Sequence, residues 1–115
     1  MEVAALNADD LTRLPEGEST RTVAERVARA RRAAFERQGK LNDELTSVEI
    51  ERVCRPEGQV RQLLHAASAR MGWSARAYHR VLKVARSIAD VEDAEDLTTQ
   101  FVAEAIQYRR SMREI

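Results

Sequence analysis

The sequence predicts an all-α protein, and three observations support this. Ala, Arg, Glu and Leu dominate the 115 residues and aromatic residues make up only 4%, a composition that favours helices over strands. Apolar residues recur at spacings of three and four. Gly, Ser and Thr stand where the periodic segments end and begin. The length suits one small domain, which we expect to be a four-helix bundle preceded by a long basic helix.

The N-terminal residues are predicted to form a lead-in. Residues 1–7 show no helical period, whereas residues 8–14 allow one or two helical turns. Pro15 and Gly17 then mark a linker, because both residues favour turns and loops.

A long helix is predicted from about Thr20 to Gln38. Ser19 or Thr22 can cap its N-terminus, since either hydroxyl can accept a bond from an orphan amide. Gly39 is placed to end the helix. Four apolar residues share one face at helical spacing: Val23, Val27, Ala30 and Ala34.

Two shorter helices follow. Thr46 and Glu49 have capping-box spacing and open a helix that runs to about Cys54. Pro56 lies near the start of the next helix, which runs to Met71. The inward positions of that helix are predicted to be Val60, Leu63, Leu64 and Ala67.

The last two helices carry the strongest patterns. Gly72 ends the preceding helix, and Ser74 caps a helix that runs to about Val91. A final helix starts after Thr98 and is expected to fray from Arg109. The helix after Ser74 has a long apolar stripe: Ala77, Tyr78, Val81, Leu82, Ala85, Ile88 and Ala89.

The domain organisation and the charge pattern are simple. We expect a lead-in or linker at 1–18, a helical domain at 19–110 and a frayed tail at 111–115. The 19 basic and 19 acidic residues balance, which argues against a polyanionic partner for the whole surface. The charges are nevertheless polarised, because residues 21–40 hold seven basic residues and residues 90–96 hold five acids.

Several chemistries are not expected. The Gly39-Lys40 pair lacks the rest of a phosphate-binding loop. Cys54 is the only cysteine, so an internal disulfide is impossible and a cytoplasmic location fits. With His65 and His79 as the only histidines, no metal site is expected. No apolar run is long enough to span a membrane. We therefore expect no catalytic residues in this chain alone.

Arg76 is the strongest candidate for a binding residue. It follows the Ser74 cap within the first helical turn, where acidic rather than basic residues are usual. An external anion such as a phosphate would explain a cation there. Arg80 and Lys83 share its face at spacings of four and three. For Arg80, Lys83 and Arg86, a solvated face with ion pairs to neighbouring acids is the favoured interpretation.

The helix at 20–38 offers a second candidate surface. The favoured interpretation is a partly exposed helix that packs through arginine stems; the alternatives are nucleic-acid backbone contact or an intersubunit surface, for which Arg29, Arg32 and Lys83 are the candidates. Trp73 is either a stacking platform or a seal between two helices. The basic residues of the helix are Arg21, Arg26, Arg29, Arg31, Arg32 and Arg37.

Several of these stretches resemble one family. Residues 74–80 (S-A-R-A-Y-H-R) and 84–90 (V-A-R-S-I-A-D) closely resemble the C-terminal domain of the magnesium-chelatase-like AAA+ proteins of the ComM/YifB family. Residues 17–31 resemble the entry into that domain, residues 38–42 its next loop and residues 103–109 its last helix.

The resemblance implies a larger parent protein with a Lon-protease-like domain, a P-loop AAA+ core and this domain as the helical lid. The parent would be an ATPase that uses ATP and Mg, with neither bound by the lid alone. Its partners would be the AAA+ core, neighbouring ring subunits and DNA, as in a hexameric branch-migration helicase, with no membrane. The chain then looks like an excised C-terminal piece.

The resemblance also implies a role for Arg76. In AAA+ lids, an arginine at the start of one helix acts as sensor 2 and contacts the γ-phosphate. Arg76 matches that position, and Arg80, one turn further, is the reserve candidate. Whether Arg76 acts on its own subunit or on a neighbour stays open. The alternative function is a stand-alone helical module that contacts nucleic acid or a protein through residues 20–38.

Overall fold

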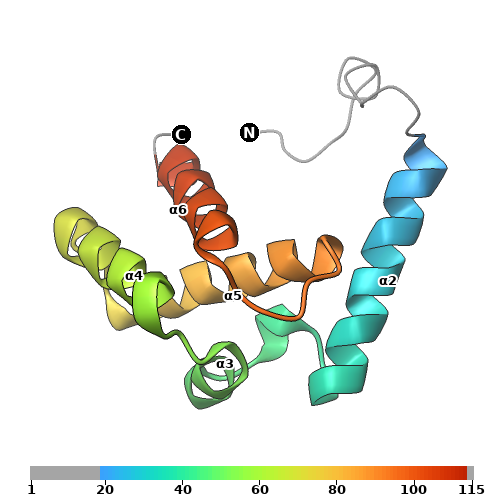
Figure 1. Cartoon of the computed structure of the whole chain (residues 1–115), viewed down its shortest axis with the longest axis horizontal. Coiled ribbons are helices and arrows are strands. Elements are labelled where there is room, and N and C mark those ends of the chain that lie inside the picture. Colours follow the sequence, from blue (N-terminus) through green and yellow to red (C-terminus); the bar gives the residue numbers. More distant parts are fainter. Residues whose placement is uncertain (1–18, 114–115) are drawn as a thin grey trace.

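Helices form the regular structure of residues 19–113, the part of the chain that the computed structural model describes, and this confirms the all-α prediction (Figure 1). The helical turns expected at 8–14 lie outside the described residues. The elements are α2 (Thr20–Gln38), the 3-10 turn η1 (Asn42–Glu44), α3 (Ser47–Cys54), α4 (Gly58–Met71), α5 (Ala75–Val91) and α6 (Thr99–Arg113).

α2 begins and ends at local signals. The Ser19 hydroxyl accepts a bond from the Thr22 amide at 3.1 Å, so Ser19 rather than Thr22 is the cap. Gly39 adopts φ 78°, and its N–H bonds the Phe35 carbonyl at 2.8 Å. Only Ala30 and Ala34 of α2 are buried. The long helix is therefore attached to the bundle mainly through its C-terminal half.

α3 opens with the predicted capping box. The Thr46 hydroxyl accepts from the Glu49 amide at 3.2 Å, and the Glu49 carboxylate accepts from the Thr46 amide at 2.8 Å. This backbone bond, together with Lys40, holds the pKa of Glu49 below its usual value. α4 then starts at Gly58, after Glu57 and two residues beyond Pro56. Gly72, at φ 65°, ends α4.

The core lies among α3, α4, α5 and α6, and α5 occupies its centre because it packs against α2, η1, α3 and α6. Trp73 packs against this core at the junction of α4 and α5, which supports the interpretation of Trp73 as a seal. The largest fully buried side chains are Ile50, Leu64, Val81, Leu82 and Val102.

α6 differs from the expectation at its end. Leu97 packs against the core and Val102 is fully buried, as their positions around the helix start predict. Tyr108, on the same helix, is 54% exposed. The helix continues beyond Arg109 to Arg113.

A buried polar cluster joins α2 to the bundle; we call it the Asp90 network, and it comprises Asp90, Arg37, Asn42 and Arg86. The Arg37 guanidinium donates to both Asp90 oxygens, at 2.9 and 3.0 Å. Asn42 Nδ2 and Arg86 Nη2 donate to the same carboxylate at 2.9 and 3.0 Å. Arg86 is only 3% exposed, so its predicted place on a solvated face is wrong.

Arg86 also binds the turn that follows α5. Its guanidinium donates to the carbonyls of Ala94 and Glu95 at 2.7 and 3.0 Å. Burial alone would raise the pKa of Asp90, but the hydrogen bonds from Arg37 and Asn42 and the charges of both arginines outweigh it and lower that pKa. Asp90 is thus a buried carboxylate that is ion-paired with Arg37 and Arg86.

Candidate functional site

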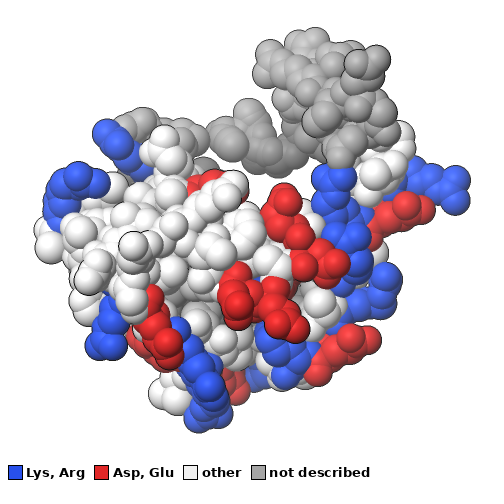
Figure 2. All heavy atoms as spheres, in the orientation of Figure 1, with Lys and Arg blue, Asp and Glu red and all other residues white. Residues whose placement is uncertain are grey.

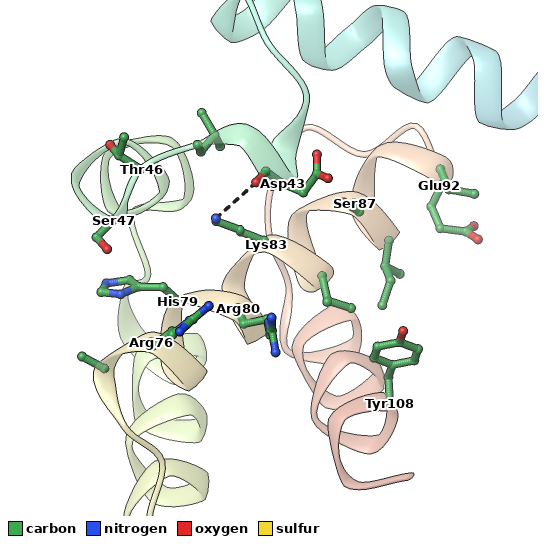
Figure 3. A pocket seen from close by; sticks show the side chains of 15 residues that line it. Asp43, Thr46, Ser47, Arg76, His79, Arg80, Lys83, Ser87, Glu92 and Tyr108 are labelled. Carbon is green, nitrogen blue, oxygen red and sulfur yellow. Dashed lines mark hydrogen bonds between the residues drawn. The ribbon is translucent and has the colours of Figure 1, made fainter. Parts of the chain in front are cut away.

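One face of α5 lines a groove of about 1070 Å³, which we call the α5 groove (Figure 3). In Figure 3, side chains of α5 run along it, with the start of α3 on one side and Tyr108 of α6 on the other. The groove collects residues from η1, α3, α5 and α6 that are far apart in the sequence.

The amphipathic pattern of α5 creates this arrangement. Val81, Leu82 and Ala85 are at most 1% exposed and fix the inner face of the helix. Residues at spacings of three and four on the other side share a face. Arg76, Arg80, Lys83 and Ser87 follow this spacing, and all four line the α5 groove.

Arg76 lies at the mouth of α5. The Ser74 hydroxyl accepts from the Ala77 amide at 3.1 Å, which confirms Ser74 as the cap. Arg76 is exposed, and within residues 19–113 the structure gives it no hydrogen bond and no ion pair. Its guanidinium and the positive end of the helix dipole therefore act together in the groove, where they can bind an anion.

Arg80 and Lys83 extend the positive charge along the helix. Arg80 is exposed and, within the described residues, also has no hydrogen bond or ion pair. Lys83 Nζ donates to the Asp43 carbonyl of η1 at a long 3.4 Å. A neutral carbonyl leaves the lysine charge unbalanced, so the row of three cations remains available to a ligand.

His79 forms the link between this row and α3. His79 Nε2 lies 2.9 Å from Glu51 Oε2. Thr46 and Ser47 line the same wall of the groove. We call this end, defined by Arg76, His79, Arg80 and Lys83, the cationic half of the groove.

The other end of the groove has a different character. Val84, Ile88 and Val91 of α5 line it together with Tyr108. Glu92, at the C-terminal end of α5, lies beside them. We call the three aliphatic residues and Tyr108 the apolar half.

The arginines of α2 have mostly intramolecular roles. Arg21 pairs with Glu25 at 3.4 Å, and Arg29 donates to the Val91 carbonyl at 3.2 Å. Arg37 belongs to the Asp90 network, and Arg26 also interacts within the chain. In Figure 2, the basic side chains on the side that α2 forms lie among acidic ones, and other basic side chains lie along the opposite and lower edges.

The three candidates for an interaction surface are placed in different surroundings. Arg29 is bonded to the end of α5, and Lys83 lies in the α5 groove. Arg32 lines a shallow hollow on the outer side of α2, together with Phe35. The described structure thus does not gather these residues into one basic patch.

Other chemistries gain no support from the described residues. Among residues 19–113, no group of three or more His, Cys, Asp or Glu side chains is arranged to hold a metal ion. Burial raises the pKa of the Cys54 thiol to about 12, so it stays protonated and poorly nucleophilic. None of the described helices combines the length and apolar character needed to cross a membrane.

The walls of the groove were not predictable from the sequence. Thr46 and Tyr108 line the groove and Glu51 pairs with its residue His79, but none gave a local signal of a site, because each lies outside α5. The pairing of His79 with Glu51 joins residues 28 positions apart. Only the packing of α3 and α6 on α5 reveals this arrangement.

Comparison with known proteins adds three findings. Residues 17–109 match the family model described as magnesium chelatase, subunit ChlI C-terminal. The YifB protein of Escherichia coli K12 is 44% identical over 93 residues, which are 81% of this chain and 18% of that protein. The competence protein ComM of Haemophilus influenzae is 41% identical over 97 residues, 84% of this chain and 19% of that protein. The chain thus spans about a fifth of the length of these relatives.

Proposed function

The chain belongs to the family of the magnesium chelatase subunit ChlI C-terminal domain, as found in the ComM/YifB proteins, and from this premise we propose that it is the helical lid of a ring ATPase with Arg76 as sensor 2. The lid would close over ATP held by a P-loop core elsewhere in the parent protein. The cationic half of the α5 groove would face that nucleotide.

The observation that carries the proposal is the state of Arg76. It stands in the first turn of α5, lines the α5 groove and has no carboxylate partner among the described residues. Arg86, an arginine that does stabilise the bundle, is instead paired with Asp90. An unpaired guanidinium at a helix N-terminus is suited to a phosphate.

In this proposal, the residues of the lid only donate hydrogen bonds to the nucleotide. ATP and Mg, bound by the core, supply the reacting γ-phosphate. Arg76 would donate planar, charge-assisted hydrogen bonds to it, and Arg80 is the reserve donor one turn along the helix. Loss of that contact after hydrolysis would release the lid and change its angle to the core.

For the parent protein, we propose action on DNA as a ring of subunits. The support is the match to a protein named for competence and the resemblance to branch-migration helicases. Neighbouring subunits and the AAA+ core are the expected partners.

The experiment that tests the lid proposal uses a protein that joins this domain to its ATPase core. We expect Arg76→Ala to lower ATP turnover on the order of a thousandfold, the scale of other phosphate-contacting arginines. Arg76→Lys should not restore turnover, because an ammonium lacks the planar fork.

The control is Arg70→Ala, which removes an exposed arginine of α4 outside the α5 groove. It should leave turnover unchanged. In the 115-residue chain, Arg76→Ala should change the unfolding free energy by less than about 0.5 kcal/mol, as for other surface changes. Turnover close to wild type in the Arg76→Ala protein would contradict the assignment.

The alternative function, a nucleic-acid module built on α2, has less support. Four of its six arginines interact within the chain, namely Arg21, Arg26, Arg29 and Arg37. Few guanidiniums then remain for phosphates. An anisotropy titration with labelled oligonucleotides at low salt distinguishes the lid from the nucleic-acid module. Tight binding whose affinity falls steeply with added salt would favour the module.

A further inference from the structure

Phe35 is an exposed anchor on the outer side of α2. It is 51% exposed, although aromatic residues are few in this chain. With Ala28, Arg31 and Arg32 it lines a shallow hollow of about 470 Å³, which Glu36 completes. Ala30 and Ala34 face the bundle instead, so Phe35 has no packing role in the described core. We call the face formed by Phe35, Arg31 and Arg32 the α2 outer face.

The arginines of this face form no direct charge pair among the described residues, although Arg31 also lines a hollow with Asp43 and Asp90. In the part of the chain that the structure describes, neither Arg31 nor Arg32 has a hydrogen bond or an ion pair. Glu36 is the only acidic residue in the hollow on the α2 outer face. The α2 outer face therefore combines one aromatic side chain with a net positive charge.

The apolar half of the α5 groove has the complementary character. Tyr108 is 54% exposed and lines the groove beside Ile88 and Val91. Glu92 borders it, and Asp93, also exposed, follows in the turn. The structure gives these two carboxylates no partner within residues 19–113. An apolar recess with an acidic rim fits an aromatic side chain flanked by arginines.

We propose that the α2 outer face of one copy docks in the apolar half of the α5 groove of a second copy. Phe35 enters the recess between Ile88 and Tyr108, and Arg32 faces Glu92. The proposal deepens the ring ATPase proposed above, since it names a contact between neighbouring lids. The contact itself needs no nucleotide.

The second copy is the occupant because both complementary surfaces belong to one chain with a net charge of zero. The two patches are different, so the contact is heterologous, and each docked pair leaves one patch of each kind unused. Heterologous contacts produce rings or open filaments rather than closed dimers. A nucleic acid would not fit this half of the groove, because the acidic rim would repel phosphates.

The contact is expected to be weak on its own. A single aromatic anchor with a small rim falls below about 1,200 Å² of buried surface, the range of transient contacts. We therefore expect a dissociation constant on the order of 100 μM for the 115-residue chain. Salt should weaken it further, because the charged rim stays partly exposed to solvent.

Sedimentation equilibrium of the 115-residue chain tests the proposal. The weight-average mass should rise with protein concentration and fall towards the monomer at high salt. Phe35→Ala should weaken self-association about tenfold or more, as truncation of an interface anchor does. Val48→Ala is the matched control, because Val48 is 64% exposed on α3 and lines neither surface; it should leave the association constant unchanged.

A charge swap identifies the second surface. Arg32→Glu alone and Glu92→Arg alone should each weaken association, whereas the double variant should restore it because the pair reforms with opposite signs. A chain that stays monomeric at every concentration, equal effects of Phe35→Ala and Val48→Ala, or a double variant no better than the single ones would each overturn the proposal. Since mass is measured without nucleotide, these outcomes leave the role of Arg76 untouched.

Discussion

Asp90 shows how one side chain organises its surroundings. Its carboxylate receives four hydrogen bonds, two from Arg37 and one each from Asn42 and Arg86. Two guanidiniums and one carboxylate leave an excess positive charge, which the carbonyls of Ala94 and Glu95 offset. Removing the carboxylate would leave the buried Arg86 guanidinium without a counter-ion.

Asp90→Asn should therefore destabilise the fold. We expect the free energy of unfolding at pH 7 to fall by about 3 kcal/mol, as when one partner of a buried ion pair is lost. Because the pKa of Asp90 is lowered when folded, its stabilisation is complete above the ordinary value of 3.8 and disappears as pH falls through the folded pKa. The difference between variant and wild type should thus shrink below about pH 4.

Urea denaturation at several pH values measures the unfolding free energies of Asp90→Asn and wild type. Asp43→Asn is the control, because only the backbone carbonyl of Asp43 has a hydrogen bond among the described residues. It should change stability by less than about 0.5 kcal/mol. A difference between Asp90→Asn and wild type that stays constant from pH 7 to pH 3 would show that the ion pairs contribute nothing.

The Asp90 network also marks a limit of sequence reasoning. Arg86 and Asp90 stand four residues apart, a spacing that surface ion pairs also have. Nothing in that spacing indicates that Arg37, which lies 53 positions before Asp90, also donates to the Asp90 carboxylate. Burial of charged side chains depends on tertiary packing, so the prediction of a solvated Arg86 failed where the local prediction for Ser74 succeeded.

At the scale of elements, α5 has two structural roles. Its inner face fills the core, and its outer face lines the groove. The start of the helix determines where Arg76 lies, since Arg76 is only one residue beyond the first helical position. The Ser74 cap thus fixes both the register of α5 and the position of the cation.

Ser74→Ala should cost about 1 kcal/mol of unfolding free energy, because the Ala77 amide loses its acceptor. In the protein that joins this domain to an ATPase core, the same change should raise the concentration of ATP needed for half-maximal turnover. Thermal denaturation and steady-state ATP hydrolysis measure the two effects.

Ser47→Ala is the comparison for this variant. Ser47 lies at the start of α3 and lines the groove, but its hydroxyl caps no amide among the described residues. Its stability should stay within about 0.5 kcal/mol of wild type. Equal losses in the two variants would mean that the cap of α5 is unimportant.

Helix boundaries were the most predictable part of the fold. Helix caps act through hydrogen bonds between residues that are close in sequence. The structure has the predicted caps at Gly39, Gly72, Ser74 and the Thr46–Glu49 box. Tyr108 was less predictable, because whether it is covered depends on which helix packs against α6. The groove between distant elements could not be predicted for the same reason.

At the scale of the whole molecule, the helices are unequally attached. α5 packs against four other elements, whereas α2 packs mainly against α5. The N-terminal half of α2 contributes no buried residue. Local opening is easiest where few apolar contacts hold a helix.

Hydrogen exchange should reveal this gradient. We expect the amides of Val81 to Ala85 to exchange slowest, because they lie in the core, and those of the first two turns of α2 to exchange much faster. Mass spectrometry of peptic fragments measures both regions in one experiment. Equal protection of α2 and α5 would show that α2 is held by more than its C-terminal half.

The position of Trp73 has a practical consequence. It is the only tryptophan of the chain, and it lies at the α4–α5 junction, three residues before Arg76. Its indole nitrogen is shielded from solvent. Its intrinsic fluorescence is therefore a built-in optical reporter for the α4–α5 junction beside Arg76, readable without any attached dye.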